Sequence, residues 1–198
     1  MKFIDVVERL RKQFSGQELP ADRAILQEQA GIAAQSCLQC LRKDAWPIKI
    51  GKALNSLGFE LWVKDFPDDN ISGVMAIHAD EKFPKVIGVN ANDSYEHQRF
   101  TLAHELAHYI FDIADIDRET VITQHYDTDV NVETHPAEYR ANQFAAQLLL
   151  PEKMFRQEVA TARQMYSEPA TVMAEVADAF DVPITSVRIR MEELNIAP

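Results

Sequence analysis

The stretch from Phe100 to Ile110 constrains this chain most, because it holds the sequence His-Glu-Leu-Ala-His at residues 104–108. If the stretch is helical, His104 and His108 lie one turn apart and roughly 40° from each other around the axis. Both imidazole rings can then reach one metal ion, and Glu105 lies beside them. Two nitrogen ligands with an adjacent carboxylate form the set that a zinc peptidase needs.

The predicted helix carries one narrow polar face on an otherwise apolar surface. At roughly 100° per residue, five polar side chains fall on that face. They are Thr101, His104, Glu105, His108 and Asp112. This pattern is typical of a buried helix that opens onto a cleft. The alternative interpretation is that the two histidines are hydrogen-bonded core residues without a metal.

A third protein ligand is predicted between Pro136 and Pro151. On a helix, Glu138 and Asn142 share a face that is otherwise lined by small residues, which let two helices approach closely. Glu138 can then reach the metal, while Asn142, one turn further on, holds a histidine ring from outside the ligand set. The alternative is that Glu138 is a solvated residue of an amphipathic helix.

The sequences RFTLAHELAHYIFD and EYRANQFAAQLLLP together resemble the ImmA/IrrE family of zinc metallopeptidases. Members carry an H-E-x-x-H helix followed by a stretch of the form E-x-E-A-N-x-F-A-A-x-L-L-M-P. The resemblance covers roughly residues 47–151. It implies one zinc ion per chain, with His104, His108 and Glu138 as ligands and Glu105 as catalytic base.

Two residues depart from the family's pattern. Arg140 stands where the family usually has its second glutamate, and Leu150 replaces a methionine. Neither change removes a proposed ligand, although Arg140 would be incompatible with a site in which the second glutamate bound the metal.

The resemblance also implies a substrate class. It is a transcriptional repressor with a helix-turn-helix fold, or an antitoxin, cut in a bacterial stress, phage or mobile-element circuit. One alternative is a zinc-containing regulatory protein that binds such a partner without cutting it. Another is a DNA-binding regulator that uses the C-terminal helices.

The net charge of −11 disfavours nonspecific binding to nucleic acid or to an anionic membrane. The sequence has no apolar run of about 18 residues and no secretory signal at its start, so we expect a cytoplasmic protein that does not enter the membrane. The two cysteines, Cys37 and Cys40, have no second pair with which to form a structural zinc site. We expect them to be small core residues.

The chain divides into three predicted units. Residues 1–45 form a helical segment that either docks on the core or engages a partner. Residues 46–151 form the peptidase core, and residues 152–198 form a helical segment with a helix-turn-helix pattern. Although the last segment contains Arg188 and Arg190, acidic side chains outnumber basic ones there, which favours packing over DNA reading.

The predicted fold class is α+β, with a zincin-like core. Three short extended runs, Phe59–Phe66, Ile71–His78 and Lys85–Asn90, are separated by turns and predict a small antiparallel three-stranded sheet packed on the two ligand-bearing helices. Ser94 is the predicted N-cap of the H-E-x-x-H helix. We expect one exposed strand of the sheet to receive a substrate as an added strand.

Residues 113–135 form a long polar connection between the two ligand-bearing helices. A connection of this length is either a mobile lid or a partly ordered insertion. It contains His125, Tyr126 and His135, each able to donate a hydrogen bond to a transition-state oxyanion. Their spacing does not select one of them, and each is alternatively a solvated surface residue.

Overall fold

The computed structural model describes residues 2–41, 46–68, 70–77, 85–113, 121–126 and 135–197, with the backbone alone over 121–126. The helices within these ranges are α1 (Phe3–Phe14), α2 (Arg23–Leu41), α3 (Ile50–Ser56), α4 (Tyr95–Phe111), α5 (Pro136–Leu149), α6 (Glu152–Met165), α7 (Pro169–Phe180) and α8 (Ile184–Glu193). The strands are β1 (Phe59–Lys64), β2 (Ile71–Ile77), β3 (Lys85–Asn90) and β4 (Val121–Tyr126). The predicted α+β class with helical extensions is confirmed.

The sheet is mixed and four-stranded, in the order β1-β3-β2-β4. Strand β2 pairs antiparallel with β3 and β4, whereas β1 pairs parallel with β3. The three predicted strands are present, and the predicted antiparallel pairing of β2 with β3 is confirmed, but the predicted direction of β1 was wrong and β4 was missed. Burial explains the order of the strands, because β3 is buried along most of its length, whereas most of β1 is exposed. The apolar strand takes the interior position and β1 takes the edge.

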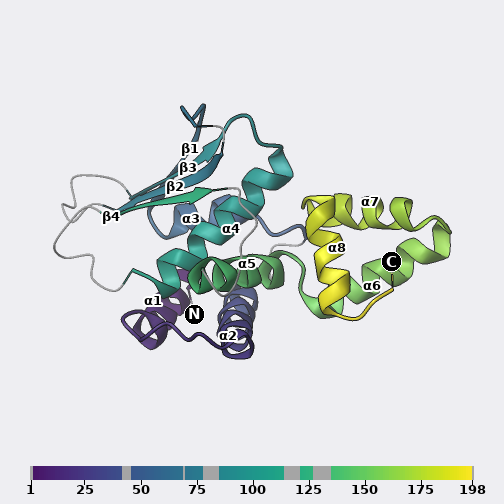
Figure 1. Ribbon diagram of the computed structural model, residues 1–198, viewed down its shortest axis with the longest axis horizontal. Helices are drawn as coiled ribbons and strands as arrows, with labels where there is room; N and C mark the ends of the chain where they lie inside the picture. The colour runs from purple at the N-terminus through teal and green to yellow at the C-terminus, as the bar shows by residue number, and fades with distance from the viewer. Residues whose placement is uncertain are drawn as a thin grey trace.

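The elements form layers that place α4 at the centre of the molecule (Figure 1). Helix α4 packs against β2 and β3 on one side and against α5 on the other, and α5 in turn packs on α2. The side chains that fill these layers are fully buried; they include Met75, Ile87, Leu106, Ile110, Phe144 and Leu148. Both predicted ligand-bearing helices are thus held on two sides by the core.

The N-terminal helices dock on the core, which is one of the two roles left open by their sequence. The Arg11 guanidinium in α1 donates hydrogen bonds to the carbonyl oxygens of Tyr109 and Ile113, and it lies 4.1 Å from the centroid of the Tyr109 ring. The Tyr109 carbonyl lies in the last turn of α4, where backbone acceptors lack partners within the helix, and Ile113 follows the C-cap residue. In α2, Cys37 is buried and Cys40 is half-buried, which fits the predicted packing role.

The C-terminal helices α6, α7 and α8 pack on one another beside the core (Figure 1). Arg99 of α4 links them to the core by donating to the carbonyl oxygen of Asp181 at 2.9 Å.

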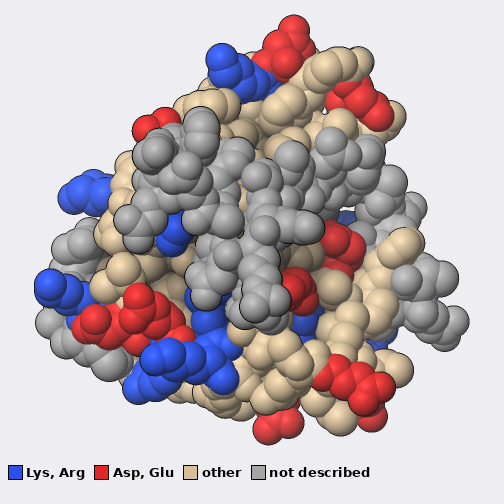
Figure 2. All heavy atoms as spheres, turned by 90° about the vertical axis from the view of Figure 1, so that its left-hand side faces the viewer, with Lys and Arg blue, Asp and Glu red and all other residues tan. Residues whose placement is uncertain are grey.

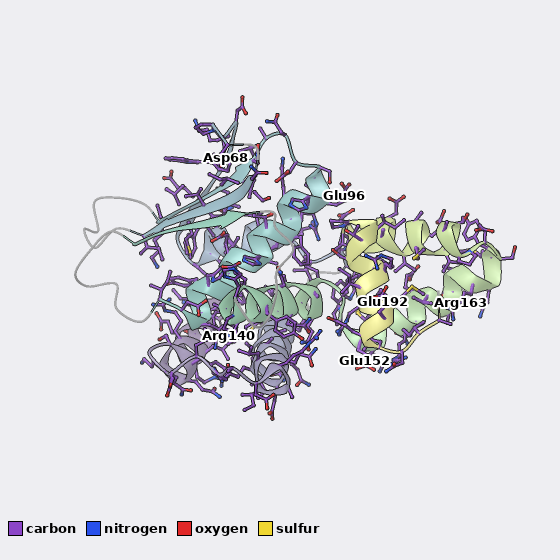
Figure 3. All side chains as sticks on the ribbon, in the orientation of Figure 1. Asp68, Glu96, Arg140, Glu152, Arg163 and Glu192 are labelled. Atoms are coloured by element: carbon purple, nitrogen blue, oxygen red, sulfur yellow. The ribbon has the colours of Figure 1, made fainter. Side chains whose placement is uncertain are left out.

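Arg190 is buried and donates to the Leu150 carbonyl oxygen and to Glu193. Arg188 is exposed and pairs with Glu192, which is labelled in Figure 3. These contacts favour the packing role of this segment over DNA reading.

On the face shown in Figure 2, acidic and basic side chains are interspersed over the described surface. Within the described ranges, no helix is both long enough and apolar enough to cross a membrane.

Candidate metal centre

Helix α4 begins as its sequence predicts. The Ser94 side chain accepts a hydrogen bond from the backbone N–H of His97 at 3.2 Å, so Ser94 is the N-cap. The helix then runs without interruption to Phe111. Within it, His104 and Glu105 are fully buried and His108 is nearly so. The buried helix fixes both imidazole rings on the side that faces α5.

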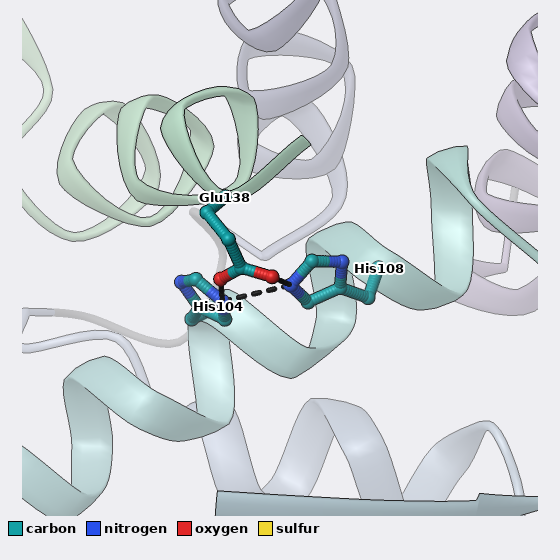
Figure 4. A group of neighbouring side chains, drawn as sticks. All are labelled: His104, His108 and Glu138. Atoms are coloured by element: carbon teal, nitrogen blue, oxygen red, sulfur yellow. Dashed lines mark hydrogen bonds and ion pairs between the residues drawn. The ribbon is translucent and has the colours of Figure 1, made fainter. Parts of the chain in front are cut away.

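Helix α5 brings Glu138 onto the two histidines (Figure 4). One Glu138 carboxylate oxygen lies 3.0 Å from Nε2 of His104, and the other lies 3.3 Å from Nε2 of His108. The two Nε2 atoms are 2.8 Å apart. The structure therefore assembles the three residues predicted as ligands, with a possible ligand atom from each within 4.8 Å of the others. The Glu138 side chain remains 31% exposed, so the group is reachable from outside.

Hydrogen bonds on the far side of each ring fix which nitrogen faces the centre. Nδ1 of His104 lies 2.8 Å from Oδ1 of Asn142, and Nδ1 of His108 lies 2.7 Å from Oδ2 of Asp112. Because both partners are acceptors, both Nδ1 atoms carry a hydrogen, and both Nε2 atoms face Glu138, where each offers its lone pair when its ring is neutral. Asn142 contacts a histidine ring, as its spacing of one turn from Glu138 predicted. Asp112 was predicted only as part of the polar face, although its position four residues after His108 was a usable signal.

The residues fit a divalent metal ion. Two imidazole lone pairs and a carboxylate are all acceptors, and they converge within hydrogen-bond distance of each other. Such a group favours positive charge at its centre, carried by a proton or by a metal ion, and nitrogen with oxygen donors is a set that zinc accepts. Burial lowers the pKa of His108, but the hydrogen bonds with Asp112 and Glu138 and the charge of Glu105 outweigh burial and raise the pKa to about 10. The centre therefore attracts positive charge.

This electrostatic arrangement predicts how the stability of the metal-free protein depends on pH. The pKa of His108 rises from 6.5 to about 10 in the folded chain. Protonated His108 therefore contributes stability that is complete below about pH 6.5 and is lost as the pH rises through about 10. After chelation of metal, we expect a lower melting temperature at pH 9 than at pH 7, measured by circular dichroism.

A His108→Gln variant provides the reference for that measurement, because other groups also titrate in this range. The fall in melting temperature from pH 7 to pH 9 should be smaller in the variant than in the unaltered chain. Equal falls in the two proteins would contradict the assignment to His108.

Glu105 lies between α4 and the sheet, where β2 leaves room for it. A Cβ atom added at Gly73 would lie 3.1 Å from Oε1 of Glu105 and 2.5 Å from Cγ2 of Thr101. The absence of a side chain at Gly73 thus allows the strand to approach the carboxylate closely. Glu105 is held against the sheet beside the two histidines, which limits the positions that its carboxylate can adopt.

We predict that Gly73→Ala lowers peptidase activity and destabilises the protein by about 1–3 kcal/mol, the usual cost of overpacking. The added methyl group must displace Thr101 or the strand, and either movement shifts Glu105. Denaturant unfolding and a cleavage assay measure the two effects. Gly88→Ala in β3 is the matched control, because its Cβ would come closest to the tip of the Phe66 ring, at 3.3 Å, and would meet the Val74 carbonyl oxygen only at an ordinary contact distance of 3.9 Å. Equal losses in both variants would contradict a specific role for Gly73.

Of the three predicted oxyanion donors, only His135 has a side chain within the described residues. His125 and Tyr126 belong to β4, where their side chains lie outside the described residues. The backbone of residue 125 pairs with Gly73, so β4 runs beside the part of β2 that contacts Glu105. His135 is exposed at the N-cap of α5, three positions before Glu138. Strand β4 also shows that the 113–135 connection contains ordered structure.

Arg140 does not enter the centre. It is buried, and its guanidinium pairs with Asp112 at 2.6 Å. Its presence in place of the family's usual second glutamate therefore leaves the approach of Glu138 to the histidines intact.

No curated protein matches the chain. The model of one family, described as peptidase M78, IrrE N-terminal-like domain, matches residues 55–192. This match includes both helices of the centre and extends into α8, further toward the C-terminus than the resemblance predicted from sequence. It spans well over half of the chain. With an H-E-x-x-H helix and a downstream glutamate converging in space, the chain belongs to this metallopeptidase family.

Proposed function

We propose that the protein is a zinc-dependent endopeptidase that cleaves a transcriptional repressor or an antitoxin within a bacterial stress, phage or mobile-element circuit. The observation that carries the proposal is the convergence of His104, His108 and Glu138 beside the buried carboxylate of Glu105. Membership in a metallopeptidase family supports the hydrolytic chemistry.

The three converging residues would hold the ion, and the donors suit this task for distinct reasons. Both imidazoles present Nε2 as a lone pair because Asn142 and Asp112 occupy the opposite nitrogens. Glu138 adds a negative charge that favours a divalent cation. When bound with three protein ligands, zinc polarises a peptide carbonyl and lowers the pKa of water to roughly 7.

Glu105 supplies the proton transfers in this proposal. Its carboxylate accepts a proton from the attacking water and later donates a proton to the departing amine. The position of Glu105 in α4, between the two histidines, keeps it next to the reacting atoms. Contact with β2 at Gly73 restricts its motion, so the carboxylate needs little reorganisation during the reaction.

The sheet offers a way to orient the substrate. Strand β4 lies at one end of the strand order and next to β2, which contacts Glu105 through Gly73. We infer that an extended substrate segment adds along this edge, because main-chain pairing would hold a peptide in register beside the centre. A basic repressor would also be attracted by the net charge of −11.

Incubation with a candidate substrate tests the proposal. A small helix-turn-helix regulator encoded next to this gene is the first candidate, and mass spectrometry of the mixture identifies any cut. We expect one or a few zinc-dependent cleavage products that a chelator abolishes. Stable binding without cleavage would support a non-proteolytic regulatory partner instead. Tight DNA binding by the chain alone, with a steep dependence on salt concentration, would support a DNA-binding regulator.

A further inference from the structure

We infer that Arg140 is a positioning residue of the metal centre, which acts on the His108 ring through Asp112. This inference rests on the proposed metal-binding function and adds a residue that the ligand motif does not contain. Arg140 lies in α5, where that helix meets α4 and the N-terminal helices (Figure 3). Its hydrogen bonds go to Asp112 and Gln29, neither of which is a proposed ligand.

Asp112 joins Arg140 to the centre with one carboxylate oxygen for each partner. Oδ1 accepts a hydrogen bond from Nη2 of Arg140 at 2.6 Å, and Oδ2 accepts one from Nδ1 of His108 at 2.7 Å. Asp112 is the C-cap residue of α4 and its side chain is 27% exposed. An aspartate at such a position has several rotamers open to it. The ion pair with Arg140 selects the rotamer that accepts from His108.

Arg140 is itself held from two directions. Its Nη1 atom donates to Oε1 of Gln29 in α2 at 2.8 Å, and its guanidinium carbon lies 4.4 Å from the centroid of the Phe111 ring. The residue is only 4% exposed. A planar guanidinium binds the two acceptors through separate nitrogens of one rigid fork while its carbon lies over the ring, a geometry that the single nitrogen of an ammonium group does not reproduce. The orientation of His108 is thus tied to a side chain of the N-terminal segment.

This connection affects metal binding through the tautomer and the orientation of His108. A carboxylate at Nδ1 keeps the hydrogen on that atom, so Nε2 offers its lone pair toward Glu138. If Asp112 turns away, the ring gains rotational freedom and loses the partner that raises its basicity. Loss of an outer partner of this kind typically weakens metal binding by about 10–100-fold. We expect Arg140→Gln to fall within that range.

A double-mutant cycle separates this indirect route from a general disturbance of α5. The zinc dissociation constant is measured by competition with a chelator for the unaltered chain, Arg140→Gln, Asp112→Asn and the double variant. If Arg140 acts through Asp112, adding Arg140→Gln to Asp112→Asn should weaken zinc binding by no more than about twofold. NMR of labelled histidine should also show faster exchange or loss of the Nδ1 proton of His108 in Arg140→Gln.

Arg23→Gln is the matched control, because Arg23 is a second arginine contact between α2 and α5. Its Nε donates to the Tyr139 hydroxyl at 2.8 Å, and its guanidinium carbon lies 4.9 Å from the centroid of that ring. This variant should lose stability while its zinc dissociation constant stays within twofold of that of the unaltered chain. Arg140→Lys serves as a second variant that keeps the buried charge and one hydrogen bond, with an intermediate loss expected.

Two results would overturn the inference. One is a zinc dissociation constant within twofold of the unaltered value in both Arg140→Gln and Arg140→Lys. The other is a full, additive loss when Arg140→Gln is combined with Asp112→Asn. Failure of the unaltered chain to bind zinc would instead contradict the proposed function, so the two failures are distinguishable.

Discussion

Replacement of Glu105 by glutamine is expected to lower the rate of substrate cleavage by about 10²–10⁴-fold, the usual contribution of a general acid–base group. Glutamine has nearly the same shape as glutamate but cannot accept the proton of the attacking water. Because Glu105 is not one of the three converging ligands, the zinc content should stay at one ion per chain. The initial rate of cleavage and the metal content of the purified protein measure the two effects.

The control for this experiment is Glu96→Gln, the same chemical change in the first turn of the same helix. That variant should cleave at close to the unaltered rate, because Glu96 lies two turns before the centre. Unimpaired cleavage by Glu105→Gln would remove Glu105 from the mechanism. A loss of zinc in Glu105→Gln would show that its carboxylate holds the ion.

Replacement of Glu138 by glutamine is expected to weaken zinc binding by more than the 10–100-fold that loss of an outer hydrogen bond costs. The substitution removes the only carboxylate among the three converging ligands and leaves two neutral imidazoles. Charge is decisive here, since a divalent cation in a partly buried site is stabilised strongly by an adjacent anion. Chelator competition gives the dissociation constant, and cleavage should fall in proportion to the zinc that is lost.

Glu152→Gln makes the same change of net charge at an exposed position in the first turn of α6. Zinc binding should be unaffected there, which separates the local effect of Glu138 from that of overall charge. Zinc bound equally well by Glu138→Gln and the unaltered chain would mean that another group completes the site.

The sheet contains features that could not be predicted from the sequence. The three runs of β1, β2 and β3 were identified because alternating or continuous apolar residues between turns are a local signal. The order of these strands in the sheet was not predicted, because it depends on which strand buries more of its surface against the helices. Strand β4 was also missed: its residues lie in a polar connection and become a strand by pairing with β2. Strand pairing between distant segments carries little signal in either segment alone.

The outer partners of the histidines show the same division. Asn142 was predicted because it lies one turn after Glu138 on the same helix face, and the structure places it on His104. The link from His108 through Asp112 and Arg140 to Gln29 was not predicted, because it joins three helices. From sequence, Arg140 was only a departure from the family's pattern, and its contacts supply the reason why it can be accommodated.

By itself, the sequence determined the elements whose geometry is fixed by covalent spacing. The period of an α-helix places His104 and His108 on one face with Glu105 beside them, and a serine cap sets where that helix begins. Only the tertiary structure decided how closely α5 approaches α4, whether Glu138 meets the imidazoles, and which strand lies at the edge of the sheet. Those outcomes depend on how side chains from distant parts of the chain fit together. Such packing leaves no regular spacing of residues in the sequence.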